Sequence, residues 1–166
     1  IAYHHPSQPI QLDPARYEML PLGSETLAPY VKPDERGEPR HVLPGTAAHL
    51  LPYLAYAPGA YMGRAVDHLL SQSVTPVHLD RIYETDMSEG LKAMALEGHG
   101  VAFLPASAVR REVAARRLVR AGEGYETTLD IRIYRERPGS RKAKRIVDEF
   151  WRELQAKLPA TEAAAD

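Results

Sequence analysis

The fold is predicted from one stretch of sequence, Glu84-Thr-Asp-Met-Ser-Glu-Gly-Leu-Lys-Ala-Met-Ala-Leu-Glu-Gly-His-Gly-Val-Ala-Phe-Leu-Pro105. Asp86 and Glu89 have the three-residue spacing of a capping box, which predicts a helix over 86–97. Apolar residues then recur at helical spacing, at Met87, Leu91, Met94 and Ala95. Gly98 and Gly100 flank His99 where the helix must end, because glycine tolerates the positive φ of a helix stop. The apolar run from Val101 to Leu104, closed by proline, predicts a strand covered on both faces.

The surrounding sequence repeats the strand–helix pattern from residue 51 to residue 120. Residues 51–57 and 77–84 read as strands, and 60–72 as a helix whose apolar side carries Met62, Ala65, Val66, Leu69 and Leu70. A further helix follows Pro105 and ends before the short Leu-Val strand at 118–119. This alternation predicts βαβ units, and therefore an α/β fold with a mainly parallel sheet between helices.

The first fifty residues differ, with three predicted strands at 1–5, 17–22 and 26–31 and almost no helix. Gly23-Ser24 is interpreted as the link between the second and third strands, and 46–51 as a short helix. The chain starts without methionine, directly in a strand-like pattern, so we expect a fragment of a longer protein. The strand at Ile1–His5 is then expected to lack neighbours supplied by this chain, which leaves a sheet edge for upstream residues or another subunit to cover.

The last part of the chain predicts one strand and one long helix. Apolar and polar residues alternate over 127–135, as in a half-buried strand. Ser140 is placed to cap a helix with an apolar face made of Ala143, Ile146, Val147, Phe150, Trp151, Leu154 and Leu158. The tail 159–166 has little to bury and is predicted to be disordered.

Composition narrows the possible functions. With 166 residues, the chain is one medium domain or two small lobes, and its net charge of −1 gives no overall basic footprint for nucleic acid. It has no cysteine, which excludes disulfides, thiolate metal sites and a thiol redox sensor. No apolar run is long enough to span a bilayer and no signal peptide is recognised, so we expect a cytoplasmic protein without a membrane partner.

The sequence contains no well-formed catalytic or metal-binding motif. The seven histidines include no pair at i, i+4 ligand spacing, and no serine has a G-x-S-x-G context. Gly98-His-Gly100 follows a helix and precedes a strand, which is the reverse of the order in a dinucleotide fingerprint. We therefore expect no enzyme activity, no metal and no cofactor.

A binding site is predicted beyond the carboxyl ends of the parallel strands, where open α/β sheets hold ligands. Thr85, Asp86, Met87 and Ser88 lie at the start of the helix there, and its unpaired amides attract anions and polar groups. The segment 58–64 follows the preceding strand in the same way. For Thr85 and Asp86, plain helix capping is the competing explanation.

The motif at 84–105, continued by Pro105-Ala-Ser-Ala-Val-Arg-Arg-Glu-Val-Ala-Ala-Arg-Arg-Leu-Val-Arg120, resembles the second lobe of the effector-binding domain of LysR-type transcriptional regulators. The resemblance implies a periplasmic-binding-protein-like fold of two Rossmann-like lobes, with the first lobe incomplete. It divides the chain into a partial first lobe with crossover at 1–50, a second lobe at 51–125, a crossover strand and final helix at 126–158, and the tail. It also implies a small-molecule effector, a homodimer or homotetramer, and DNA binding through a helix-turn-helix domain absent from this chain.

Three shorter segments, Tyr61-Met-Gly-Arg64, Met87-Ser-Glu89 and Phe150-Trp-Arg-Glu-Leu154, are similar to the hypochlorite-responsive LysR-type regulators. That similarity implies that methionine oxidation is the signal, carried by Met62 or Met87 with Tyr61 nearby. The competing explanation for both methionines is ordinary packing in the core. His4 and His5, near the end of a first-lobe strand, are expected to present donors to an anion. A solute-binding protein, or a domain that binds an ordinary small organic anion, stays open as the alternative.

Overall fold

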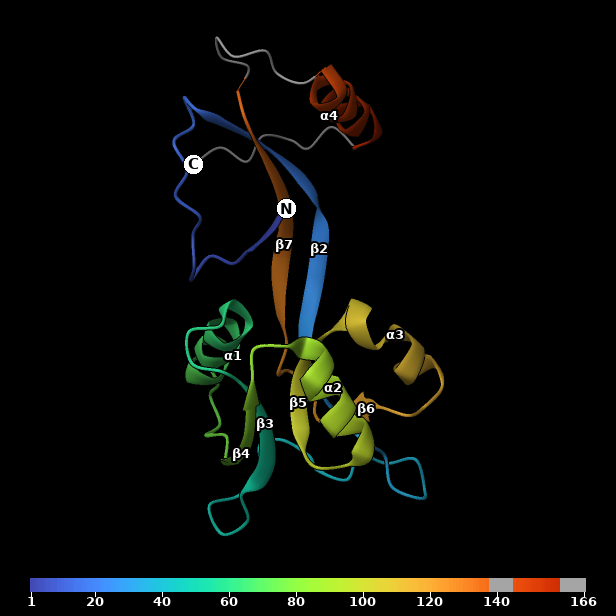
Figure 1. Cartoon of the computed structure of the whole chain (residues 1–166). Coiled ribbons are helices and arrows are strands. Elements are labelled where there is room, and N and C mark those ends of the chain that lie inside the picture. Colours follow the sequence, from blue (N-terminus) through green and yellow to red (C-terminus); the bar gives the residue numbers. More distant parts are fainter. Residues whose placement is uncertain (138–144, 159–166) are drawn as a thin grey trace. The chain divides into compact units, whose positions relative to one another are not determined.

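The structure is a computed structural model that describes residues 1–137 and 145–158. The chain forms two compact units (Figure 1). Unit 1 contains Ile1–Ser24 and the described residues from Asp130 onward, and unit 2 contains Glu25–Leu129. Two long strands, β2 (Tyr17–Val31) and β7 (Thr127–Glu136), lie next to each other in the sheet order and contribute residues to both units.

Unit 2 is built on a mixed sheet. Its further strands are β3 (Leu51–Tyr56), β4 (Leu79–Thr85), β5 (Val101–Pro105) and β6 (Val119–Arg120). β3 pairs in parallel with both β4 and β5, whereas β2 pairs antiparallel with β5 and β6. The predicted α/β fold with a mainly parallel sheet in residues 51–120 is therefore confirmed.

Three helices pack against this sheet, namely α1 (Tyr61–Ser71), α2 (Ser88–Glu97) and α3 (Ala106–Ala114). α1 buries Ala65 and Val66, while Leu69 and Leu70 of its predicted apolar side are half-buried. All five residues of β5 are buried, as expected for a strand covered on both faces. Phe103 meets Tyr53 of β3 edge-to-face, with 6.2 Å between ring centroids. The same burial raises the pKa of the Tyr53 phenol, which therefore stays neutral.

Unit 1 contains β1 (Ala2–His4), parts of β2 and β7, and α4 (Arg145–Lys157). β1 pairs antiparallel with β7, with Tyr3 opposite Ile131. The expectation that the first strand lacks a neighbour from this chain is therefore wrong. The partner strand lies far along the sequence, and no local pattern signals such a pairing.

Two other predictions are corrected. The strands expected at 17–22 and 26–31 form the single strand β2, in which Gly23 has a φ of +149° and extends the chain instead of turning it. Residues 46–51 are not a helix, because Thr46 and His49 form an isolated bridge and Leu51 already belongs to β3.

The last helix is only partly described. Three predicted features lie outside the described residues: the helix cap Ser140, the apolar residue Ala143 and the tail 159–166. Trp151 is buried and Leu154 and Leu158 are half-buried, whereas Ile146, Val147 and Phe150 are exposed. None of the helices in the described part is long and apolar enough to cross a membrane.

Candidate functional site

The carboxyl edge of unit 2 is where β3, β4 and β5 end and α1, α2 and α3 begin. Because the three strands are parallel, their ends meet at the same side of the sheet. Most of the predicted site residues lie there: Tyr61 and Met62 begin α1, and Thr85, Asp86, Met87 and Ser88 lead from β4 into α2.

Tyr56, which was not predicted from the sequence, joins the starts of α1 and α2 to the sheet. The Tyr56 hydroxyl lies 2.8 Å from the Ser88 hydroxyl, so the end of β3 is hydrogen-bonded to the start of α2. Gly63 lets α1 pack on the same tyrosine, since a Cβ atom at Gly63 would lie 3.1 Å from the Tyr56 Cβ. The sequence signal that could have identified Tyr56 is an aromatic residue at the end of a buried strand, shortly before a Pro-Gly turn.

The turn into α2 differs from the predicted capping box. The helix begins at Ser88, and its N-cap is Met87, which makes no side-chain capping bond. Thr85 Oγ1 instead accepts a hydrogen bond from the Met87 amide at 3.3 Å, and Asp86 is exposed. Glu89 pairs with Lys92, with 2.6 Å between Oε2 and Nζ. The prediction of a capping box is therefore wrong. The helix was expected to begin at residue 86, but the Thr85 turn places its start at Ser88.

The four methionines differ in exposure. Met87 is 62% exposed and Met19 is 41% exposed. Met62, the second residue of α1, and Met94 are half-buried. The competing explanation of ordinary core packing is therefore wrong for Met87, since Leu91 and Ala95 are the buried residues of α2.

Arg64 holds the first turn of α1. Its guanidinium lies 6.0 Å from the centroid of the Tyr61 ring and donates to the carbonyl of Gly59. Tyr61 therefore lies beside a cation at the carboxyl edge, next to Met62 in the chain.

The two histidines belong to unit 1. His4 Nδ1 lies 3.5 Å from Asp130 Oδ2, and the His4 side chain is 14% exposed. His5 is buried, and its Nδ1 accepts from the Ser7 amide at 3.2 Å and contacts the Ser7 hydroxyl at 2.6 Å. Because His5 Nδ1 is an acceptor, the ring proton is on Nε2. Within the described residues, no group of three His, Cys, Asp or Glu side chains could hold a metal ion.

A buried carboxylate at the start of α3 was also missed. Glu25 is 7% exposed, and its Oε1 accepts from the amides of Thr26 at 3.0 Å and Ser107 at 3.2 Å. The Ser107 hydroxyl donates to Oε2. Glu25 therefore supplies the negative charge that a helix N-terminus favours. Nothing local in the sequence distinguishes it from an exposed glutamate.

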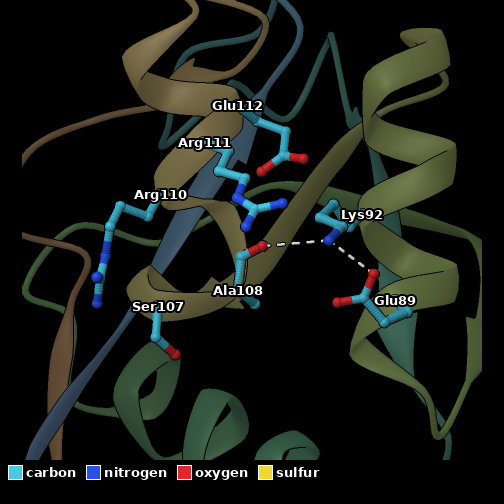
Figure 2. Close-up of a pocket in the computed structure, with 7 residues that line it drawn as sticks. All are labelled: Glu89, Lys92, Ser107, Ala108, Arg110, Arg111 and Glu112. Atoms are coloured by element: carbon cyan, nitrogen blue, oxygen red, sulfur yellow. Dashed lines mark hydrogen bonds and ion pairs between the residues drawn. The ribbon is translucent and has the colours of Figure 1, made fainter.

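A cavity of about 480 Å³ lies between α2 and α3 (Figure 2). It is lined by Glu89 and Lys92 from α2 and by Ser107, Ala108, Arg110, Arg111 and Glu112 from α3. None of the predicted site residues lines this cavity, although Glu89 follows Ser88 directly in α2.

A sequence profile described as the LysR substrate binding domain matches residues 1–159. The chain belongs to this family. LysR-type proteins are transcriptional regulators and not enzymes, and the observed α/β fold is the periplasmic-binding-protein-like fold of their regulatory domains.

The chain is also similar to two curated transcriptional regulators. Over 141 residues, or 85% of this chain, it is 31% identical to the HTH-type transcriptional regulator YjiE of Escherichia coli K12, of which it covers 45%. The chain is also 31% identical, over 141 residues or 85% of its length, to the HTH domain-truncated transcriptional regulator QseD of Escherichia coli O157:H7, of which it covers 56%. The chain thus spans about half the length of these relatives.

The structure is similar to the regulatory domain of HypT from Salmonella typhimurium. The TM-score is 0.77 at 28% identity, and the match covers 93% of this chain and 69% of that domain. The full-length HypT structure, described as a hypochlorite-specific LysR-type transcriptional regulator, matches with a TM-score of 0.76 over 93% of this chain and 49% of HypT, also at 28% identity. The HypT regulatory domain is also known with a bromide ion bound.

Proposed function

We propose that the chain is the oxidant-sensing part of a DNA-binding LysR-type regulator, and that Met87 is its sensing residue. One observation carries this proposal: Met87 is the N-cap of α2, is 62% exposed, and leaves the helix without a side-chain cap. The likeness to hypochlorite-specific HypT supports hypochlorite as the oxidant.

The chemistry requires only the thioether and the oxidant. Hypochlorous acid transfers its oxygen to the sulfur, the sulfur is oxidised by two electrons to a sulfoxide, and chloride and a proton leave. The reaction converts an apolar thioether into a polar group with a strong acceptor oxygen. Met87 is the most exposed of the four methionines, so it meets a dissolved oxidant first.

The sulfoxide would act on the start of α2. Met87 O already accepts from the amides of Gly90 and Leu91, at 3.0 Å and 3.2 Å. Among the described residues, no acceptor is found for the amides of Ser88 and Glu89. A thioether is a weak acceptor, whereas a sulfoxide oxygen on the N-cap side chain can accept from a first-turn amide. Oxidation would therefore turn Met87 into a capping residue and shift the Tyr56–Ser88 contact beside it.

The other predicted residues have supporting roles in this proposal. Thr85 and Asp86 form the turn that presents Met87, Ser88 ties the turn to β3, and Met62 beside Tyr61 is a second, slower oxidation site. His4 and His5 remain predicted donors to an anion. The regulator would act in the cytoplasm as a homodimer or homotetramer, and would bind DNA through its helix-turn-helix domain.

A second candidate function is recognition of an ordinary small organic anion. It is favoured by the hydroxyls of Tyr56, Ser88 and Thr85 at the carboxyl edge, close to the first-turn amides of α2. The bromide ion bound to the HypT domain supports anion binding in this family.

The two functions are separated by a reporter assay with the full-length regulator. Met87→Gln places an amide oxygen at the N-cap and should regulate the target gene without hypochlorite. Met87→Leu keeps an apolar side chain that cannot form a sulfoxide, and should abolish the response. Met94→Leu is the matched control and should respond normally. If both Met87 variants behave like the unaltered protein, Met87 is not the sensor and the organic-anion function is favoured.

A further inference from the structure

We propose that the cavity between α2 and α3 is a second ligand site, which binds a small zwitterion of the amino-acid class. The cavity is lined by side chains from two helices of unit 2, and its volume of about 480 Å³ is within the usual range for small-molecule sites. It is separate from Met87, so this inference goes beyond oxidant sensing.

Lys92 is held in place on the α2 side. Its side chain is 17% exposed, its Nζ lies 2.6 Å from Glu89 Oε2, and it donates to the carbonyl of Ala108 at 3.2 Å. Figure 2 shows both interactions across the wall of the cavity. An ammonium has three donors, so a fixed Lys92 keeps one for a ligand.

The α3 side supplies one charge of each sign. Arg111 and Glu112 both extend from α3 into the space facing Lys92, whereas Arg110 extends to the other side of the helix (Figure 2). Among residues 1–137 and 145–158, no side-chain hydrogen bond or ion pair is found for Arg111 or Glu112. Their charges are therefore available to a ligand.

The arrangement of charges selects the ligand class. The Arg111 guanidinium presents a two-pronged donor that matches a carboxylate, and the spare Lys92 donor adds to it. The Glu112 carboxylate repels a simple anion but attracts an ammonium group. A molecule with both a carboxylate and an ammonium satisfies both sides. Because Glu89 and Lys92 lie in the first turns of α2, such a ligand would also contact the helix that begins after Met87.

Isothermal titration calorimetry with the 166-residue chain tests the proposal with three matched probes. L-valine carries both charges, isovalerate lacks the ammonium, and isobutylamine lacks the carboxylate. We expect valine to bind, and each analogue to bind at least roughly tenfold more weakly, the loss typical of one charged hydrogen-bonded group.

Variants locate the site. Arg111→Gln should weaken valine binding by roughly tenfold or more, and Glu112→Gln should remove the preference for valine over isovalerate. Arg117→Gln loses the same charge at an exposed residue that follows α3 and does not line the cavity, and it should leave binding unchanged. Circular dichroism checks that each variant is folded, and a crystal of the unaltered chain soaked in valine should show density between α2 and α3. Equal binding of the three probes, no binding at millimolar valine, or equal losses in the Arg117 and Arg111 variants would overturn the proposal.

Discussion

Gly100 directly precedes β5 and lies close to the backbone of β3. A Cβ atom there would lie 2.4 Å from the carbonyl oxygen and 2.9 Å from the carbonyl carbon of Pro52 in β3. Both atoms are backbone, in a strand that pairs with β5, so neither can move without separating the strands. Glycine is therefore required at this position by packing.

We expect Gly100→Ala to lower the free energy of unfolding by about 2–3 kcal/mol, as overpacked sites do. Urea denaturation measures the loss. Gly90→Ala is the control, because its Cβ would meet the terminal Thr85 Cγ2 at 3.3 Å and because alanine favours a helix over glycine by about 1 kcal/mol. If both variants lost the same stability, the backbone clash at Gly100 would not be the cause.

Glu25 is a second residue whose environment gives a definite expectation. Its carboxylate accepts three hydrogen bonds, from Thr26 and from the amide and hydroxyl of Ser107. Glu25→Gln replaces an accepting oxygen with a donor and should cost about 1–3 kcal/mol of unfolding free energy, since a buried donor is left unpaired. The exposed Glu35→Gln should change stability by less than about 0.5 kcal/mol in the same urea titration. Equal stability of both variants would contradict this role.

The contrast between Gly98 and Asp86 explains which residues the sequence predicts well. Gly98 has a φ of +89° and ends α2 as predicted, because few residues other than glycine adopt that conformation. Asp86 fits a capping pattern that many non-capping residues also fit. Whether Asp86 caps the helix or stays exposed depended on the Thr85 side chain. The contact of Thr85 with the Met87 amide has no distinct signal in the sequence.

At the scale of elements, Arg135 joins α4 to the strands of unit 1. Its guanidinium pairs with Glu18 of β2 and with Asp148 of α4, the latter at 2.9 Å, and lies 4.6 Å from the centre of the Trp151 ring. The Arg135 side chain is 17% exposed and Trp151 is 2% exposed. One planar cation therefore satisfies two carboxylates and covers the ring that anchors α4.

Replacing Arg135 with lysine should loosen α4, because an ammonium cannot pair with both carboxylates and stack on the ring in the same way. We expect a loss of about 1–2 kcal/mol in the unfolding of this region. Trp151 is the only tryptophan of the chain, so its fluorescence during urea denaturation reports this contact. Arg132→Lys, which affects a pair with Asp130 that is more exposed than the pair of Arg135 with Glu18, is the control. An unchanged midpoint for Arg135→Lys would contradict the account.

The elements of unit 2 were predictable because their signals are local. Helical spacing, a glycine stop and a short apolar run all lie within a few residues of one another in 84–105. β2 was predicted as two strands because Gly23-Ser24 resembles a turn. In the structure Gly23 is extended and the strand continues through it. Gly23 lies next to the boundary between the two units, since the first segment of unit 1 ends at Ser24 and unit 2 begins at Glu25.

At the scale of the whole molecule, long-range pairing limited the prediction. β1 pairs with β7, and Ala2 lies opposite Arg132, so no window of sequence contains both partners. The candidate site was predicted in part, since the carboxyl edge follows from strand order. Tyr56, Glu25 and the charges between α2 and α3 emerged only from packing.

Association is a further property of the whole protein. LysR-type regulators form oligomers, and the chain spans about half the length of its curated relatives. We expect the full-length protein to be a homodimer or homotetramer, because a DNA-binding regulator commonly matches the symmetry of its site. Multi-angle light scattering of the full-length protein measures this directly. A strict monomer at micromolar concentration would contradict the expectation.

The most direct test of oxidant sensing is the order in which the methionines react with limiting hypochlorite, followed by peptide mass spectrometry of the folded chain. We expect Met87 to become a sulfoxide first, ahead of Met19 and of the half-buried Met62 and Met94, because Met87 is 62% exposed. Oxidation of the urea-unfolded chain gives the reference in which all four are accessible. Equal rates for all four methionines in the folded chain, or a Met87 slower than Met19, would contradict the claim that Met87 is the sensor.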